Sequence, residues 1–154
     1  MASGRGAWGT PVQEVTDRIT RATKTGQLLA GWRFVPYPIT EAEGITDLPT
    51  VRLQGFTVEE ASRSQNASFA SVTVVVMVAV PKTEGLAALA AAAQKVIDAI
   101  ETDSAGEVDE TVGMTTIRGV TIRQNQSGAS GNAAFCMLDV SCESAPFKRA
   151  GRHS

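Results

Sequence analysis

Histidine, the residue used most often as a general base or metal ligand, occurs only once in this sequence. His153 is the penultimate residue and belongs to a basic segment, residues 148–154, that we expect to be a flexible tail. Catalytic and metal-binding side chains must be held rigidly in place. The glycine-rich stretch 127–132 also lacks the lysine of a phosphate-binding loop. The sequence therefore predicts no catalytic residues, no metal, no cofactor and no enzymatic activity.

Cysteine is almost as scarce, and its spacing argues against a disulfide. Cys136 and Cys142 lie six residues apart in a segment that alternates like one strand, which separates them by about 20 Å. A disulfide needs Cα atoms within about 7 Å of each other. Both cysteines alternate with the apolar residues Leu138 and Val140. We therefore expect two buried free thiols.

Long apolar runs and a strong excess of one charge are also missing. The run from Val74 to Val80 has seven residues, far fewer than the roughly 20 that span a bilayer. The chain carries 14 basic and 16 acidic residues, unlike the strongly basic domains that bind nucleic acid. Residues 1–9 have no apolar core of a secretory signal. We expect no membrane contact and a protein that stays in the cytoplasm where it is made.

The residues that are present suffice for one globular domain, since 43% of the 154 are hydrophobic. We assign this domain to residues 10–147. The glycine-rich residues 1–9 are predicted to be a flexible N-terminal arm. This arm contains one large aromatic residue, Trp8, which either docks onto the chain's own body or inserts into a neighbouring subunit.

Two segments have the residue spacing of helices. Thr10 followed by Pro11 forms a helix-start signature, and an apolar stripe follows it up to a predicted end near Gly26. A second, alanine-rich helix is predicted from Leu86 to Thr102. Its expected apolar face consists of Leu86, Leu89, Ala93, Val96, Ile97 and Ile100.

The strongest strand signal is the segment from Phe69 to Val80, where valines at alternate positions predict one buried face. We expect a central strand of about 40 Å, long enough for one end to project past the helices. Two weaker strands are predicted before it. Residues 28–39 contain two prolines and suit an edge strand, and residues 51–56 form a short strand, followed by a polar loop over residues 59–67.

Two further strands, residues 114–124 and 133–143, are predicted to form a hairpin, with a β-bulge near Gly119 where the apolar alternation shifts. The element order then predicts an α+β fold, a mainly antiparallel sheet with two helices packed on one face.

The sheet face opposite the helices is predicted to be a mixture of apolar and charged residues. Phe135 and Met137 share this face with Asp139, for which Arg118 on the neighbouring strand is the candidate partner. Such a mixture suits a subunit contact better than a dry core or open water.

The segment after the second predicted helix is acidic and has no apolar periodicity. It lacks the ligand spacing of a calcium-binding loop, so it is either a solvated loop or a charged contact surface. Its acidic residues are Asp103, Glu107, Asp109 and Glu110.

Taken together, these segments resemble the tail terminator, or tail completion, proteins of long-tailed bacteriophages over residues 11–147. The resemblance lies in the capped first helix, the strand SFASVTVVVMVAV, the helix ending in VIDAIE and the closing strand AFCMLDVSCESAPF. It implies a structural virion protein that forms a ring, usually a hexamer, on the last ring of tail tube protein.

In that family the ring stops tube growth and presents the surface that joins the tail to the head connector. The resemblance further implies a location in the neck region of the virion tail, assembly in the host cytoplasm, and DNA that passes through the lumen without specific binding. The candidate interface residues are Trp8, Phe135, Met137, Asp139, Asp103, Glu107, Asp109, Glu110 and Arg118.

Three alternatives stay open. One is a head-tail connector or another structural subunit of the neck or tail, which would show the same lack of catalytic residues. The second is a small-molecule-binding α+β module, which would require a closed apolar pocket. The third is an enzyme, which would have to use Asp139, Glu143 or Arg118 without a histidine.

Overall fold

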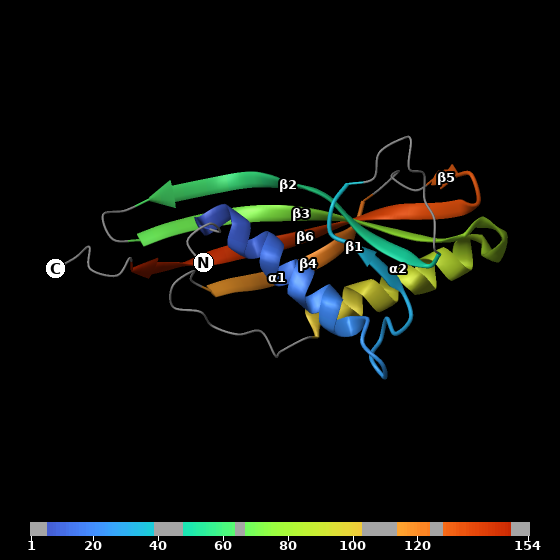
Figure 1. The fold of residues 1–154 in the computed structure, drawn as a ribbon. Helices are drawn as coiled ribbons and strands as arrows, with labels where there is room; N and C mark the ends of the chain where they lie inside the picture. The colour runs from blue at the N-terminus through green and yellow to red at the C-terminus, as the bar shows by residue number, and fades with distance from the viewer. Residues whose placement is uncertain (1–5, 39–47, 64–66, 103–113, 124–127, 149–154) are drawn as a thin grey trace.

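A computed structural model describes residues 6–38, 48–63, 67–102, 114–123 and 128–148 (Figure 1). The elements in chain order are α1 (Gly6–Ala22), β1 (Arg33–Val35), β2 (Thr50–Arg63), β3 (Ala67–Pro81), the 3-10 turn η2 (Lys82–Glu84), α2 (Gly85–Glu101), β4 (Met114–Ile122), β5 (Gly128–Ser130) and β6 (Ala133–Lys148). The fold is α+β, as the sequence predicts.

The six strands form one sheet in the order β1-β2-β3-β6-β4, with β5 paired to β6. Every pair is antiparallel except β1 with β2. The valine-rich β3 lies at the centre, which confirms the strand pattern. The β-bulge expected near Gly119 is also confirmed, because the β4–β6 register shifts between Ile117 and Gly119.

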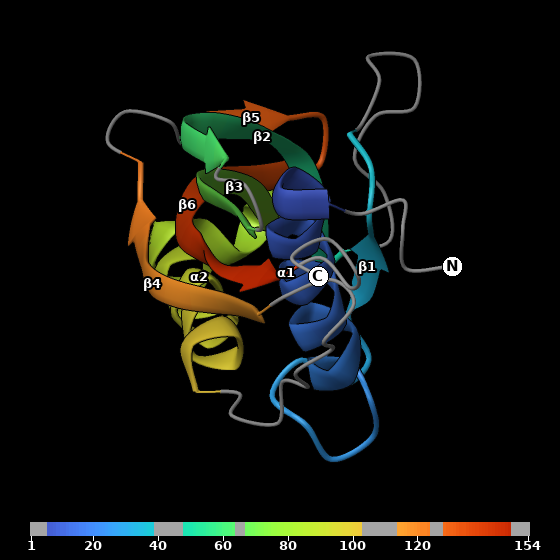
Figure 2. The same cartoon turned by 90° about the vertical axis from the view of Figure 1, so that its left-hand side faces the viewer.

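The main hydrophobic core lies between the sheet and the two helices, which both cover the same face (Figure 2). The alternate valines of β3 supply the centre of this core, and β6 adds the predicted residues around Leu138. The fully or nearly fully buried residues include Val15, Ile19, Val72, Val74, Val76, Val78, Leu89, Val96, Ile100, Cys136, Leu138, Val140 and Cys142.

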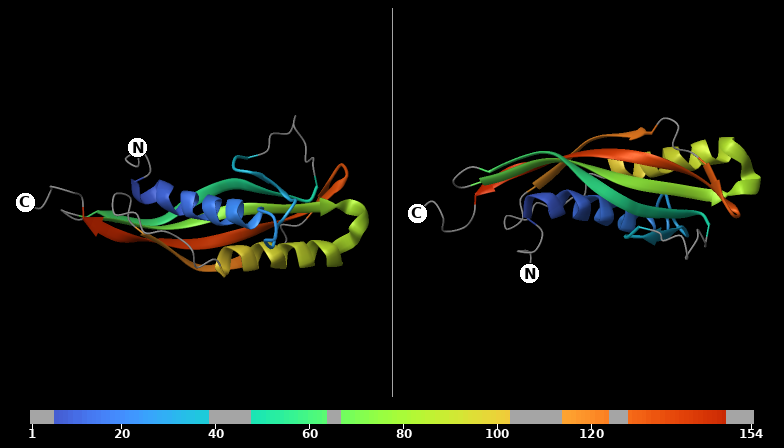
Figure 3. Two further views of the ribbon diagram at one scale, coloured as in Figure 1. Left: turned by 60° about the horizontal axis from the view of Figure 1, so that its bottom comes forward. Right: turned by 90° about the horizontal axis from the view of Figure 1, so that it is seen from above.

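One predicted core residue of α2 is exposed instead. Leu86 lies on the same side of the helix as the predicted apolar face, but its side chain is 74% exposed. The first turn of α2 follows directly after β3 and η2, at the margin of the sheet (Figure 3). The strands therefore do not extend far enough to cover Leu86, and the buried stripe of α2 begins at Leu89.

Helix α1 begins at Gly6 rather than at Thr10, so that Pro11 lies inside the helix. The predicted start at Thr10 was therefore wrong by four residues. The helix continues through Pro11, although the proline ring leaves one backbone hydrogen bond unmade. The helix ends at Ala22, before the predicted Gly26, which occupies the following turn with φ of +83°. Residues 1–5 of the predicted arm lie outside the described residues.

Strand β2 is much longer than its apolar pattern predicts. The expected polar loop over residues 59–67 is wrong for residues 59–63, which continue β2 and pair with β3. Polar residues are stable in this position because the neighbouring strand satisfies their backbone groups. Conversely, the predicted strand over residues 28–39 is reduced to the three residues of β1.

The sheet is longer than the helices that cover it. At one end of the molecule, β2, β3 and β6 extend beyond α1, whereas α2 begins at the opposite end (Figure 3). This agrees with the projection predicted from the length of β3. The molecule therefore has two different ends, one formed by strands alone and one at which β5 and the start of α2 lie (Figures 1 and 3).

Candidate assembly interface

The outer face of the sheet, opposite the helices, carries the apolar residues predicted for it. The register places Met77 of β3 opposite Met137 of β6. These side chains belong to a second, smaller core that consists of Met77, Ala79 and Ala133, with Leu48, Phe135 and Met137 packed around it. The predicted face is therefore correct, but its apolar half is partly covered rather than open to water.

Arg52 closes this small core on the β2 side. It lies opposite Met77 and is only 4% exposed. The sequence gives no sign of this burial, because Arg52 alternates with the core residues Val51 and Leu53 in the way that a solvated residue would.

Charged pairs occupy the outer face beyond the methionines. Arg123 donates from Nε to Oδ1 of Asp139 at 2.8 Å. Arg118, the partner that we expected for Asp139, instead forms an exposed ion pair with Glu143 at 3.2 Å. The register explains this difference, since it places Thr121 opposite Asp139 and Thr116, two residues from Arg118, opposite Glu143.

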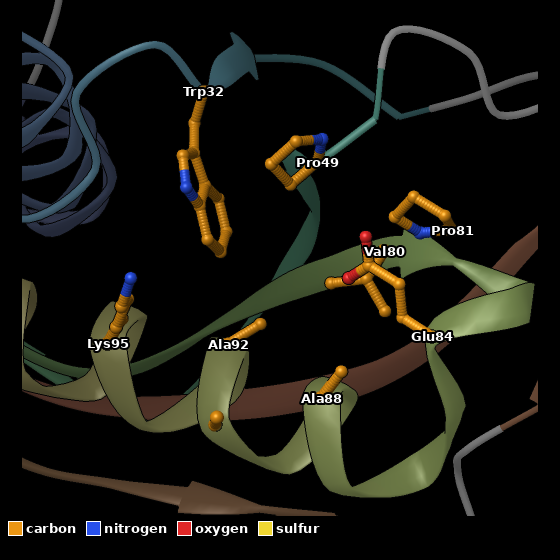
Figure 4. Close-up of a pocket in the computed structure, with 9 residues that line it drawn as sticks. Trp32, Pro49, Val80, Pro81, Glu84, Ala88, Ala92 and Lys95 are labelled. Carbon is orange, nitrogen blue, oxygen red and sulfur yellow. The ribbon is translucent and has the colours of Figure 1, made fainter.

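A pocket of about 250 Å³ lies on the helix side of the sheet, between Trp32 and the alanine-rich start of α2 (Figure 4). Its walls are mainly apolar and include Trp32, Pro49, Val80, Ala88 and Ala92. Figure 4 shows Glu84 at one end and Lys95 at the other. The lining residues Ala91 and Lys95 are exposed, so the pocket is open to solvent.

Exposed apolar residues continue from this pocket along α2. Leu86, Ala87, Ala90 and Ala91 are all exposed, and no charged residue separates them. Neither the pocket nor this strip was predicted, although the alanine block was visible in the sequence. The missing information was the position of Trp32, which lies more than fifty residues before α2 in the chain.

The strand edges carry features that disfavour pairing with another chain. Strand β2 has two register shifts, at Gln54 and Glu59, and β4 has one at Arg118. On β4 the amide of Val120 donates to the Glu101 carboxylate at 3.0 Å. Bulges and capped amides make an edge a poor template for a new strand. Faces and pockets are therefore better candidates for subunit contacts than these edges.

Both cysteines are free and buried, as predicted. Burial raises the pKa of the Cys136 thiol. Burial also raises the pKa of Cys142 to about 12. Two nearby charges have smaller effects on this pKa, since Arg18 lowers it and Glu14 raises it.

We expect neither thiol to react with the thiol reagent DTNB in the folded protein at pH 8, since the reagent attacks through the thiolate. In denaturant, both thiols should react. Because the folded pKa of Cys142 is the higher one, the folded state should lose stability as the pH rises above 9.0 toward about 12. Absorbance after DTNB addition measures the reaction, and fast labelling of either cysteine in the native protein would show that it is accessible.

The remaining predicted site residues cannot be placed. Asp103, Glu107, Asp109 and Glu110 lie outside the described residues, and of Trp8 only the helical backbone is described. Within the part of the chain that the structure describes, no three His, Cys, Asp or Glu side chains form a group that could hold a metal ion. Nor does any helix among those residues have the length and apolar character to cross a membrane.

Comparison with models of known protein families and with curated proteins gives no match. A proposal for the function therefore depends on the structure of this chain and on the likeness of its element order to the tail terminator family.

Proposed function

We propose that this protein is a tail terminator, a structural virion protein that forms a ring on the end of a bacteriophage tail tube. The observation that supports this most directly is the order of elements. A first helix, a long central strand, a second helix and a closing strand follow one another, which is the element order in which the sequence resembles the tail terminator family. Both helices cover one sheet face.

The ring would be a homo-oligomer, with six copies as in the resembling family. It would end tube polymerisation, offer its free side to the head connector and let DNA pass through its lumen without specific binding. Exposed apolar residues support association with other subunits. Among the described residues, Leu86, Tyr37 and Phe56 are each more than half exposed.

We expect the purified protein to form rings and to bind one end of preassembled tail tubes. Tubes assembled with the protein should have one length, whereas tubes assembled without it should vary in length. Light scattering measures the oligomeric mass, and negative-stain electron microscopy shows the rings and tube ends. A protein that stays monomeric at high concentration and is absent from tube ends would overturn the proposal.

A head-tail connector or another neck subunit remains the alternative, and the same experiment separates the two. A connector would bind the portal vertex of the head and leave the tube length unchanged. A small-molecule-binding module receives no support from the described residues, because the pocket beside Trp32 is open along Ala91 and Lys95 rather than closed.

A further inference from the structure

The sheet has two unlike sides. Among the described strands, β1 pairs with β2 only at Thr50–Arg52, so β2 is the outermost strand from Leu53 onward. Strand β4 is the outermost strand on the opposite side (Figure 1). A closed ring of more than two copies needs two different, matching surfaces on each subunit. Two unlike sides of one sheet meet this requirement.

The β2 side carries apolar residues next to an acid. Phe56 and Val58 lie directly opposite Val74 and Val72 of the main core, so they belong to the sheet face that the helices cover. The side chain of Phe56 is nevertheless 53% exposed. Glu59, the next residue, is exposed as well. We call Phe56, Val58 and Glu59 the β2 margin.

The β4 side has the same arrangement with a base. Val120 and Ile122 lie directly opposite the core residues Val140 and Leu138 of β6, which places them on the helix-covered face. Ile122 is 48% exposed, and Arg118 is exposed beside them. We call Arg118, Val120 and Ile122 the β4 margin.

The two margins have opposite charge. Residues 53–62 contain Glu59 and Glu60 and no basic residue, whereas residues 114–123 contain Arg118 and Arg123 and no acidic residue. Within the described residues, no ion pair involves Glu59. Arg118 binds Glu143 through Nη1, and a guanidinium has enough N–H donors for a second carboxylate. The β4 margin can therefore accept the acid of another copy without losing its own ion pair.

The strand registers place these residues at matching levels. One row of directly paired residues crosses the four strands through Val58, Val72, Cys142 and Ile117. Glu59 and Arg118 each follow an end of this row, so each lies within about 3 Å of its level along the strands. Phe56 and Val120 are the two ends of another row. A rotation about an axis parallel to the strands keeps each residue at its level.

We propose that the β2 margin of one copy packs against the β4 margin of the next copy, in a ring whose axis runs roughly parallel to the strands. Glu59 then faces Arg118 of the next copy, and Phe56 packs against Val120 and Ile122 of that copy. The bulges disfavour a shared ladder of backbone hydrogen bonds, so side chains at the margins of the sheet face make the contact. This inference rests on the proposed ring and names the contact that builds it.

Disulfide cross-linking tests the contact directly. Within one copy, three strand spacings separate β2 from β4, about 14 Å, which is too far for a disulfide. A variant with both Glu59→Cys and Arg118→Cys can therefore cross-link only between copies. With copper phenanthroline as the oxidant, we expect a ladder of covalent oligomers on a non-reducing gel. Each single variant should give no ladder, since the native cysteines are buried.

Charge reversal tests whether Glu59 and Arg118 meet. Glu59→Lys alone and Arg118→Glu alone should each weaken self-association by about fivefold, because each places like charges together. The double variant restores an opposite pair and should recover most of the wild-type association, measured by sedimentation velocity. Glu84→Lys makes the same change at an exposed residue of η2, outside both margins, and should behave like the wild type.

Truncation of Phe56 tests the apolar part of the contact. Phe56→Ala should weaken self-association by about tenfold, since the ring would otherwise be buried between two copies. Leu28 is 49% exposed in the turn region between α1 and β1, which makes Leu28→Ala the matched control. Circular dichroism of each variant confirms that the monomer is folded.

The outcomes separate this inference from the proposed function. If the wild type forms rings but the double cysteine variant gives no ladder, or the double charge variant is no better than the two single ones, the contact is wrong and the ring proposal stands. If the wild type forms no ring, alone or beside tail tubes, both fail.

Discussion

Replacing Leu138 with alanine is expected to lower the free energy of unfolding by about 3 kcal/mol. Leu138 is fully buried on β6 and faces the helices from the interior of the sheet, opposite Val76 on β3. Alanine would leave a cavity that the paired strands on both sides cannot collapse to fill. Urea denaturation followed by circular dichroism measures the change in the folded monomer.

The neighbouring residue provides a matched control. Met137 points to the outer face, where it is only partly buried in the smaller core. Met137→Ala should therefore cost about 1 kcal/mol. A loss at Met137 equal to the loss at Leu138 would show that the outer face contributes as much as the helix side, contrary to the burial of the two residues.

Replacing Arg18 with alanine is expected to lower the free energy of unfolding by about 3 kcal/mol. Arg18 joins the two helices, because its Nη1 donates to the backbone carbonyl of Ile100 near the end of α2, and its Nε donates to Glu14 at 2.8 Å. The side chains of Arg18 and Glu14 are only 12% and 14% exposed. Alanine would strand a carboxylate and a helix carbonyl without their donor.

Two further variants make this prediction specific. Arg118→Ala removes an ion pair whose side chains are 61% and 39% exposed, and should cost less than about 1 kcal/mol. Adding Glu14→Gln to Arg18→Ala removes the stranded charge and should recover part of the loss. Urea unfolding of the four proteins gives these differences. Equal losses for Arg18→Ala and Arg118→Ala would exclude the role of Arg18 as a clamp between the helices.

The parts of the fold that depend on local pattern were predictable. The alternating valines of β3 and the apolar spacing of α2 each define one buried face, and the structure buries those faces. The extent of β2 was not predictable in this way, because residues 59–63 are polar and are ordered by pairing with β3. A strand of this kind is defined by its partner rather than by its own side chains.

The candidate site depends even more on distant parts of the chain. The register of β4 against β6 places Arg118 near Glu143, and Arg123 instead pairs with Asp139. The pocket combines Trp32, Pro49 and α2, which no local pattern connects. Alternation showed which residues share a face, but pairing across the sheet and packing of the helices decide which of them meet.

The position of β6 in the sheet also affects how the subunit is made. β6 follows β3 and β4 in the chain, yet it lies between them in the sheet and pairs with both. During synthesis, β3 and β4 are made before the strand that joins them. The sheet is therefore completed only after β6 has been made, and the helices have no finished surface to cover until then. A chain without β6 leaves one side of β3 unpaired, so the subunit needs β6 before it can assemble.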